Sequence, residues 1–458
     1  MVVANANPAL GREVVRLLLD TTYRADPYPL YRRLREDNPV HRTPFKLWLI
    51  TGHSEALEVL RDSRFSNNLG SVVGNPTTAI AGDGNLSRHL ARLGSTLGTL
   101  VGYAGTGLVG LAPLLGRVAL AGLRSRSNPA ALGQVASQTL LLRDPPDHTR
   151  LRRLVVRAFS PRVVEALVPR IEKLVDELLA KAVARGSCDL MSAFAYPLPL
   201  TIICEMLGVP SIDQQQLIDW SREVVMGFDV VQTITNREAL LRANHSITAI
   251  ICYLTTLVES RRRFPTEDLI SRFVLVSDED DCLVDEEVVV MCALLLIAGH
   301  ETTVNMIGNG LVALLQHPSA AERWLAEPNL TRTAIEELLR FDPSVQTATR
   351  RASENVEVAG CEIPAGDMVM VITGAANRDP KQFEHPETLI LERDPNHHIA
   401  FGSGIHYCLG ATLARAELKV AIPALLRRRP RQLEEQLRWR TTMMVRGLEA
   451  LPVSLGQG

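Results

Sequence analysis

A charge-free stretch from Val288 to Gly299 places the strongest constraint on how this chain can fold. It belongs to a helical pattern that begins near Asp285, which could cap the helix, and continues to Gln316. Its 12 uncharged residues are too few to cross a lipid bilayer, because a spanning helix takes about 20 apolar residues. We therefore expect this helix to pass through the middle of a large core.

Most of the remaining chain also has helical periodicity. Apolar residues recur at three- and four-residue steps in 162–186, as on one face of a helix. Short strands are predicted at 47–51 and as a hairpin within 355–373, where glycines mark the turns. Neither an internal repeat nor a long polar linker divides the chain. The sequence thus predicts one mainly α domain over residues 1–458, with a small β portion.

Composition and cysteine usage favour a soluble cytoplasmic protein. The seven cysteines are scattered, show no C-x-x-C spacing and lie mostly in apolar runs, as reduced buried thiols do. The formal net charge of −2 lacks the basic surplus that nucleic-acid-binding proteins usually carry. The N-terminal sequence also lacks the basic and apolar regions of a signal peptide.

The segment from Leu93 to Gly116 is a second uncharged run, with 24 residues, seven glycines and arginines on both flanks. Glycines cost a helix about 1 kcal/mol each relative to alanine, and Pro113 weakens a helix further. A Gly-rich loop packed on its own protein as a substrate lid is therefore favoured. The alternatives are a monotopic contact that makes the protein peripheral to the membrane, and a spanning helix.

A single cysteine, Cys408, lies in the stretch "FGSGIHYCLG", residues 401–410. The nearest other cysteine in sequence is Cys361, so neither a disulfide nor a zinc site is indicated. A lone cysteine is ordinarily a small core residue. On a glycine-rich loop just before a helical pattern, however, a thiolate is suited to ligate haem iron.

The neighbours of Cys408 fit the same chemistry. Gly402, Gly404 and Gly410 would let the backbone approach a flat, bulky cofactor. Phe401 could shield the sulfur from water, and His406 could donate to an acidic edge of the cofactor.

The pattern F-G-x-G-x-H-x-C-x-G, complete from Phe401 to Gly410, resembles the haem-binding loop of the cytochrome P450 monooxygenases, specifically their soluble bacterial class. The resemblance implies a single P450 domain, a triangular prism of helices around a buried haem b. It implies that Cys408 is the thiolate ligand of the iron. Phe401, Gly402 and His406 would line the haem.

Glu337 and Arg340, in "AIEELLRFDPS", resemble the family's buried Glu-x-x-Arg pair. On a surface such a pair would contribute only a few tenths of a kcal/mol. Arg393 is the candidate for the arginine that closes the pair in the family. The resemblance implies a structural role for the three residues, which would hold the cysteine loop in place.

The stretch "LLLIAGHETT", 294–303, supplies the third similarity. By resemblance, Ala298 and Gly299 lie beside the haem, and Glu301 and Thr302 form the acid–alcohol pair that delivers protons during dioxygen activation. Burial at this depth would raise the pKa of Glu301 and suit it to relay protons near neutrality. The local alternative is that Thr302 bonds to a carbonyl one turn earlier.

Haem propionates need cationic or donor partners if they are to be buried. His148 and Arg152 lie four residues apart on one predicted helix face. The resemblance assigns these two residues, Arg350 and His406 to the propionates. Arg351 adjoins Arg350 and could be confused with it.

The resemblance implies insertion of one oxygen atom from O₂ into a lipophilic substrate such as a terpenoid, steroid, fatty acid or polyketide. Electrons would come from NAD(P)H through a reductase and a separate ferredoxin, or a flavodoxin. The enzyme would be a monomer. A peroxygenase would use hydrogen peroxide, but Glu301 and Thr302 argue against it. A haem sensor or carrier that does not turn over is the other alternative.

The chain departs from the family between 64–68 and 141–150, where relatives have a much shorter connection. We expect an apolar, Gly-rich insertion at about 70–138. In the family this connection covers the distal face of the haem and helps to form the substrate entrance. The insertion leaves the substrate and its access route undetermined by the sequence.

Overall fold

Helix α15 (Asp285–Gln316) is the central element of the computed structural model, which describes residues 21–43, 47–69, 130–227, 237–275, 277–278 and 281–456. Among the described helices, α15 alone is long and apolar enough to span a membrane, yet 72% of its most apolar window is buried inside the protein. The expected core helix is therefore confirmed. Asp285 is its first residue and not its cap, and the Glu287 side chain accepts the N–H of Val284 at 3.2 Å.

Helices before α15 in the described chain are α2 (Tyr28–Asp37), α3 (His53–Arg61), α7 (Ala130–Gln138), α8 (Asp147–Val156), α9 (Pro161–Ala184), α10 (Pro197–Leu207), α11 (Gln214–Gly227), α13 (Arg237–Arg263) and α14 (Leu269–Leu275). Those after it are α16 (Pro318–Ala326), α17 (Thr331–Phe341), α18 (Thr373–Ala376) and α19 (Ala411–Arg427). Short 3-10 and π segments are η1 (Thr21–Arg24), η2 (Leu140–Leu142), η3 (Arg157–Phe159), η4 (Met191–Ala195), η5 (Ser211–Asp213), η6 (Pro328–Leu330) and η7 (Gly404–His406).

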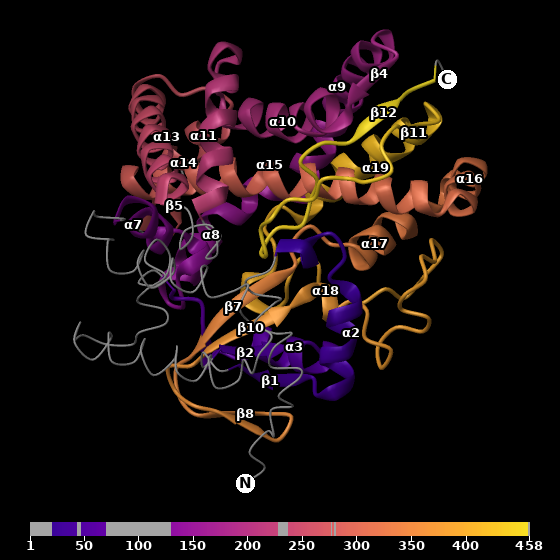
Figure 1. The fold of residues 1–458 in the computed structure, drawn as a ribbon. Coiled ribbons are helices and arrows are strands. Elements are labelled where there is room, and N and C mark those ends of the chain that lie inside the picture. Colours follow the sequence, from indigo (N-terminus) through magenta and orange to yellow (C-terminus); the bar gives the residue numbers. More distant parts are fainter. Residues whose placement is uncertain are drawn as a thin grey trace.

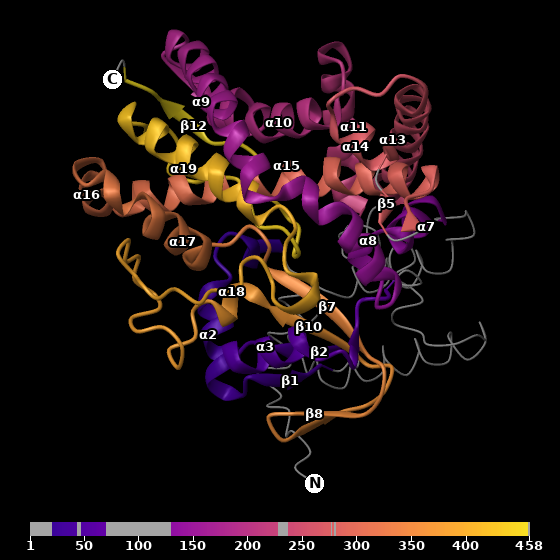
Figure 2. The ribbon, with the colours of Figure 1, turned by 180° about the vertical axis from the view of Figure 1, so that it is seen from behind.

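Most of the long helices lie on one side of α15, and the main sheet lies on the other (Figure 1 and Figure 2). Figure 1 shows α9, α10, α11 and α13 on one side, and the main sheet with α2, α3 and α18 on the other. Figure 2 shows the same arrangement from behind, with α8 and α19 toward the viewer. Helices α10, α13 and α19 pack directly on α15, so α15 is enclosed by other helices as its apolar sequence requires.

The main sheet has five strands in the order β1-β2-β10-β7-β3. These strands are β1 (Val40–Arg42), β2 (Leu47–Ile50), β3 (Phe65–Ser66), β7 (Thr347–Ala352) and β10 (Met368–Ile372). Smaller sheets join β4 (Ser187–Asp189), β11 (Arg431–Gln432) and β12 (Pro452–Ser454), and pair β5 (Ser277–Asp278) with β6 (Asp281–Cys282) and β8 (Val356–Val358) with β9 (Cys361–Ile363). The mainly α fold with a small β portion is confirmed.

The strand prediction needs one correction. The strand at 47–51 is present as β2, and the hairpin is present as β8 and β9. The last part of the predicted hairpin is instead β10, which pairs parallel with β2 and antiparallel with β7. Turn residues in the sequence predict where the chain reverses direction. The strand with which β10 pairs depends on tertiary contacts with segments that are distant in the sequence.

Residues 70–129 lie outside the described residues, and with them the segment 93–116 and most of the expected insertion. The end of the expected insertion, residues 130–138, is described and forms α7.

Glu337 and Arg340 form a fully buried ion pair within α17, both 0% exposed. Arg340 Nε and Nη2 donate to the two Glu337 oxygens at 2.7 and 2.8 Å, and Arg393 Nε donates to Oε2 at 3.0 Å. The N–H of Ile390 and the amide of Asn396 also donate to this carboxylate. The remaining Arg340 donors reach three backbone carbonyls, those of Asn377, Pro386 and Thr388. The network thus satisfies both charges and fixes the segment that leads to Cys408.

We expect the substitution Arg340→Met to lower the free energy of unfolding by about 3–5 kcal/mol, because it leaves a buried carboxylate with one fewer cation. Arg332→Met on the same helix removes an exposed ion pair with Asp394 (2.6 Å), and it should cost less than about 1 kcal/mol. Urea denaturation of both variants measures the difference. Equal losses would contradict the central role of the buried pair.

Candidate active site at the Cys408 loop

The loop 401–410 brings the thiol of Cys408 to the start of α19. The Cys408 N–H donates to the Phe401 carbonyl at 2.9 Å, which closes the loop. Cys408 is exposed, yet the surrounding protein raises the pKa of its thiol by desolvation. The N–H of Gly410 and the cations Arg152 and Arg415 act in the opposite direction. They favour the thiolate, the form that ligates metals.

Two glycines of the loop are required by its backbone conformation. Gly402 and Gly404 both have φ +71°, a left-handed conformation that other residues adopt only with strain. A Cβ on Gly404 would also lie 2.7 Å from the carbonyl oxygen of Leu60, in α3. Gly404 is therefore required by the turn and by packing on α3.

Aromatic and cationic side chains connect the loop to the helices beside it. The Arg415 guanidinium, from α19, lies 4.4 Å from the ring centroid of Phe401 and donates to the Tyr407 hydroxyl at 3.1 Å. Its other nitrogens donate to the Glu336 carboxylate of α17 at 2.7 and 2.8 Å. Arg415 thus holds the loop against α17.

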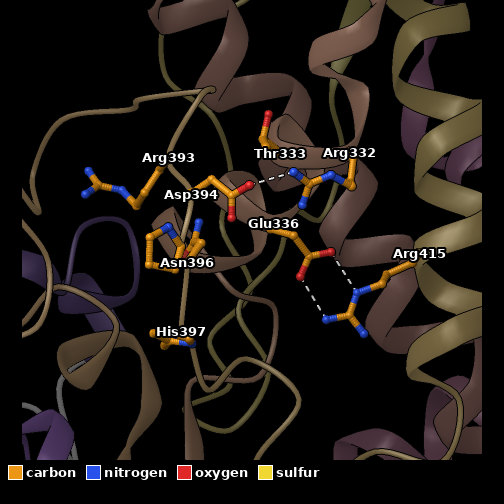
Figure 3. A pocket seen from close by; sticks show the side chains of 9 residues that line it. Arg332, Thr333, Glu336, Arg393, Asp394, Asn396, His397 and Arg415 are labelled. Carbon is orange, nitrogen blue, oxygen red and sulfur yellow. Dashed lines mark hydrogen bonds and ion pairs between the residues drawn. The ribbon is translucent and has the colours of Figure 1, made fainter.

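Figure 3 shows a pocket of about 380 Å³ between α17, α19 and the segment 393–397. Its charged side chains are already paired: Arg332 with Asp394, Glu336 with Arg415, and Arg393 with Glu337. These pairs join the three segments, so we assign this pocket a structural role and place the active site elsewhere.

His148 of α8 and His406 of the loop form a buried imidazole pair with ring centroids 4.3 Å apart. All four ring nitrogens are buried and lack a hydrogen-bond partner in the described protein. Desolvation lowers the pKa of both rings, that of His406 to about 3, where His148 and Arg350 add to the effect. Buried polar groups without partners are costly, and such rings are suited to donate to an acidic group.

Arg350 and Arg152 lie in different settings. Arg350 is buried in β7 and donates to the carbonyl of Thr349 at 2.9 Å. Burial lowers the pKa of Arg350 to about 10, and the charge of Asp144 opposes this change. Arg351 is exposed, so strand alternation distinguishes the two arginines. Arg152 donates to the carbonyl of Tyr407 at 2.7 Å. It therefore also positions the cysteine loop.

The α15 residues predicted for the site differ in exposure. Ala298 is exposed and Gly299 half-buried, although most of the helix is buried. The Thr302 hydroxyl donates to the Ala298 carbonyl at 3.2 Å, the bond that the local alternative predicted. Ala298 and Thr302 thus share one side of α15.

Glu301, one residue before Thr302, lies on a buried side of α15. Its Oε1 is in an ion pair with Arg440 and accepts from the Asn305 amide at 3.3 Å, whereas Oε2 has no hydrogen-bond partner. Burial raises the pKa of Glu301 to about 7, and Asn305 and Arg222 oppose the rise. Adjacent residues on a helix do not face each other, which explains why the carboxylate and the Thr302 hydroxyl are not hydrogen-bonded.

Comparison with known proteins identifies the family. The model of the cytochrome P450 family matches residues 121–436. The monooxygenase PikC of Streptomyces venezuelae is 37% identical over 453 residues, which cover 96% of this chain and 94% of the relative. The chain belongs to the cytochrome P450 family. It is a P450 monooxygenase.

Two further comparisons extend over nearly the whole P450. Vitamin D(3) 25-hydroxylase of Pseudonocardia autotrophica is 36% identical, with 96% of each protein covered. The crystal structure of P450BioI, in complex with an acyl carrier protein ligated to hexadec-9Z-enoic acid, matches with a TM-score of 0.79 and 32% identity. The match covers 95% of this chain and 99% of that chain.

Sequence reasoning missed two groups near the site of this P450. One is Arg440, whose contact with Glu301 joins residues 139 positions apart and carries no motif. The other is Glu417, a buried carboxyl on the α19 face that meets Thr303 of α15. A single acid within the apolar pattern "ATLARAELKVAI" was its only signal.

Burial raises the pKa of Glu417 from 4.5 to about 8, with Thr303 opposing. The folded state therefore holds this proton more tightly than the unfolded state, so stability falls as pH rises between those two values. Relative to Glu417→Gln, the wild-type free energy of unfolding should fall by about 1.4 kcal/mol per pH unit in this window.

Urea denaturation across the pH range checks this prediction. Glu322→Gln, which changes an exposed carboxyl on α16, is the control and should keep the wild-type pH dependence. Parallel curves for wild type and Glu417→Gln would show that the buried carboxyl does not titrate as expected.

Proposed function

We propose that this P450 inserts one oxygen atom from O₂ into a lipophilic small molecule, with haem b held by the Cys408 thiolate. The observation that carries the proposal is the composition of one ten-residue loop. It presents an exposed cysteine thiol and, two residues before it, an imidazole whose buried nitrogens lack partners. A metal ligand and a donor for an acidic group so close together suit haem.

The residues around the loop support the same cofactor. His148 and His406 would hold the propionates, because carboxylates would supply the acceptors that their buried ring nitrogens lack, and the buried Arg350 would add a cation. Phe401, Gly402, Ala298 and Gly299 would contact the cofactor. Arg152 would act on the cofactor chiefly through the Tyr407 carbonyl. When bound, the haem supplies the redox chemistry that activates O₂.

Glu301 and Thr302 would supply protons from the chain itself. With a pKa near 7, Glu301 can both release and regain a proton at neutral pH. Thr302 presents its hydroxyl on the side of α15 that also carries the exposed Ala298. The two groups would therefore act at opposite ends of a relay, with water between them.

Relatives support a lipophilic substrate. One is named for hydroxylation of vitamin D₃, and another was crystallised with a fatty acid on an acyl carrier protein. A steroid-like or fatty acyl substrate, free or carried on a protein, fits both. The overall reaction consumes O₂, two electrons and two protons per substrate and releases water. The electrons would come from NAD(P)H through a ferredoxin, or a flavodoxin, and its reductase in the cytoplasm.

The first test is the absorption spectrum of the reduced protein with carbon monoxide. We expect the strongly red-shifted Soret band of thiolate-ligated haem in the wild type, and its loss in Cys408→Ala. Cys361→Ala removes a buried thiol outside the loop and should leave the band unchanged. A wild-type band typical of histidine ligation, or no haem at all, would refute the proposal.

The second test concerns the relay. Thr302→Ala should retain haem but divert electrons from product to hydrogen peroxide, because the hydroxyl on the exposed side of α15 is lost. The ratio of peroxide released to NADPH consumed measures this effect. Thr302→Ser, which keeps the hydroxyl, should restore the wild-type ratio. Fully coupled turnover in Thr302→Ala would show that the threonine is not part of the relay.

A further inference from the structure

We infer that Arg440 is the positioning residue for proton exchange at Glu301: it holds Oε1 in an ion pair and leaves Oε2 as the oxygen that exchanges the proton. The inference rests on the proposed role of Glu301 in the relay. Arg440 Nη1 contacts Oε1, whereas Oε2 is buried without a hydrogen-bond partner. One proton leaves Oε2 and one returns to it, and no electrons move.

Arg440 belongs to the C-terminal hairpin, residues 438–449, which packs on α15. Its N–H donates to the Gly447 carbonyl at 2.9 Å, and Trp439 pairs with Leu448 across the hairpin. A Cβ on Gly447 would lie 1.8 Å from Asn305 Oδ1, so this close approach requires glycine. Asn305 in turn donates to the carbonyl and carboxylate of Glu301. Both strands of the hairpin therefore meet the turn of α15 that carries Glu301.

Tyr196 holds the Arg440 guanidinium in place and is itself packed against Arg222. Its Nη2 contacts the hydroxyl of Tyr196, just before α10. The Arg222 guanidinium, from α11, stacks 3.9 Å from the centroid of the same tyrosine ring. Such cation–π contacts gain strength when they are shielded from water, and Tyr196 is only 7% exposed. The guanidinium of Arg440 is thus held between the Glu301 carboxylate and the Tyr196 hydroxyl.

The titratable groups around Glu301 come from three elements. Arg440 lies on the hairpin, where the exposed Glu449 acts on it, Arg222 lies on α11, and His300 lies on α15 itself, with its Nε2 3.7 Å from Oε2. Tyr196 completes the surroundings. Burial lowers the pKa of His300 to about 4, so near neutrality this ring is uncharged. The cations that favour ionised Glu301 are therefore the two arginines.

Infrared titration of the haem-loaded protein tests the inference without turnover. The carbonyl band of protonated Glu301 is identified by its loss in Glu301→Gln. In Arg440→Gln we expect the midpoint of this band to shift upward by about one pH unit or more, a tenfold change in proton affinity, because an adjacent cation is removed. Arg440→Lys, which keeps the positive charge, should return the midpoint most of the way to its wild-type value.

Arg438→Gln is the matched control, since Arg438 lies on the same hairpin but is exposed. It should leave the midpoint unchanged. An Arg440→Gln protein that keeps the carbon monoxide spectrum and the wild-type midpoint would overturn the inference. A shift of equal size in Arg438→Gln would also overturn the inference, because the shift would then come from the loss of any nearby positive charge and not from the contact between Arg440 and Glu301.

Peroxide release separates this inference from the proposed function. The ratio of peroxide to oxygen consumed is measured without organic substrate, with NADPH, a [2Fe–2S] ferredoxin and its reductase. We expect Glu301→Gln and Arg440→Gln to raise the ratio. An unchanged ratio in Glu301→Gln would refute the relay itself. A raised ratio in Glu301→Gln, with wild-type behaviour of Arg440→Gln in both measurements, would refute only the role of Arg440.

Discussion

The buried contact between Glu337 and Arg340 is the interaction on which the rest of the structure depends. A buried ion pair adds little net stability compared with apolar packing, but removing one partner leaves an uncompensated charge. Arg340 donates to the carbonyl of Asn377, whose side chain accepts the N–H of Ile399, just before the Cys408 loop. The ion pair therefore fixes the conformation of the segment that leads to Cys408.

Features encoded by local pattern could be predicted from the sequence. The uncharged run in α15 predicted a core helix, because a long apolar helix has no other favourable place in a soluble fold. The complete loop motif predicted where Cys408 lies relative to α19. Strand alternation, once β7 was known, separated buried Arg350 from exposed Arg351, which the sequence left ambiguous.

Features that depend on distant segments could not be predicted in this way. The partner of Glu301 comes from a hairpin near the C-terminus, and the partner of β10 is a strand near the N-terminus. Neither contact leaves a spacing pattern, because both arise from tertiary packing. The separation of Glu301 from Thr302 follows from helix geometry, but which of them would be buried depended on what packs against α15.

The unpartnered rings of His148 and His406 have a consequence for the life of the protein in a cell. Under the proposed role of these rings, a haem propionate would supply the acceptors that their buried nitrogens lack, and haem would stabilise the folded state by mass action, as any ligand of that state does. Cofactor supply and protein abundance are then linked. If the proposal holds, cells short of haem would lose more of this P450 to proteolysis, and the amount of enzyme would follow the amount of haem.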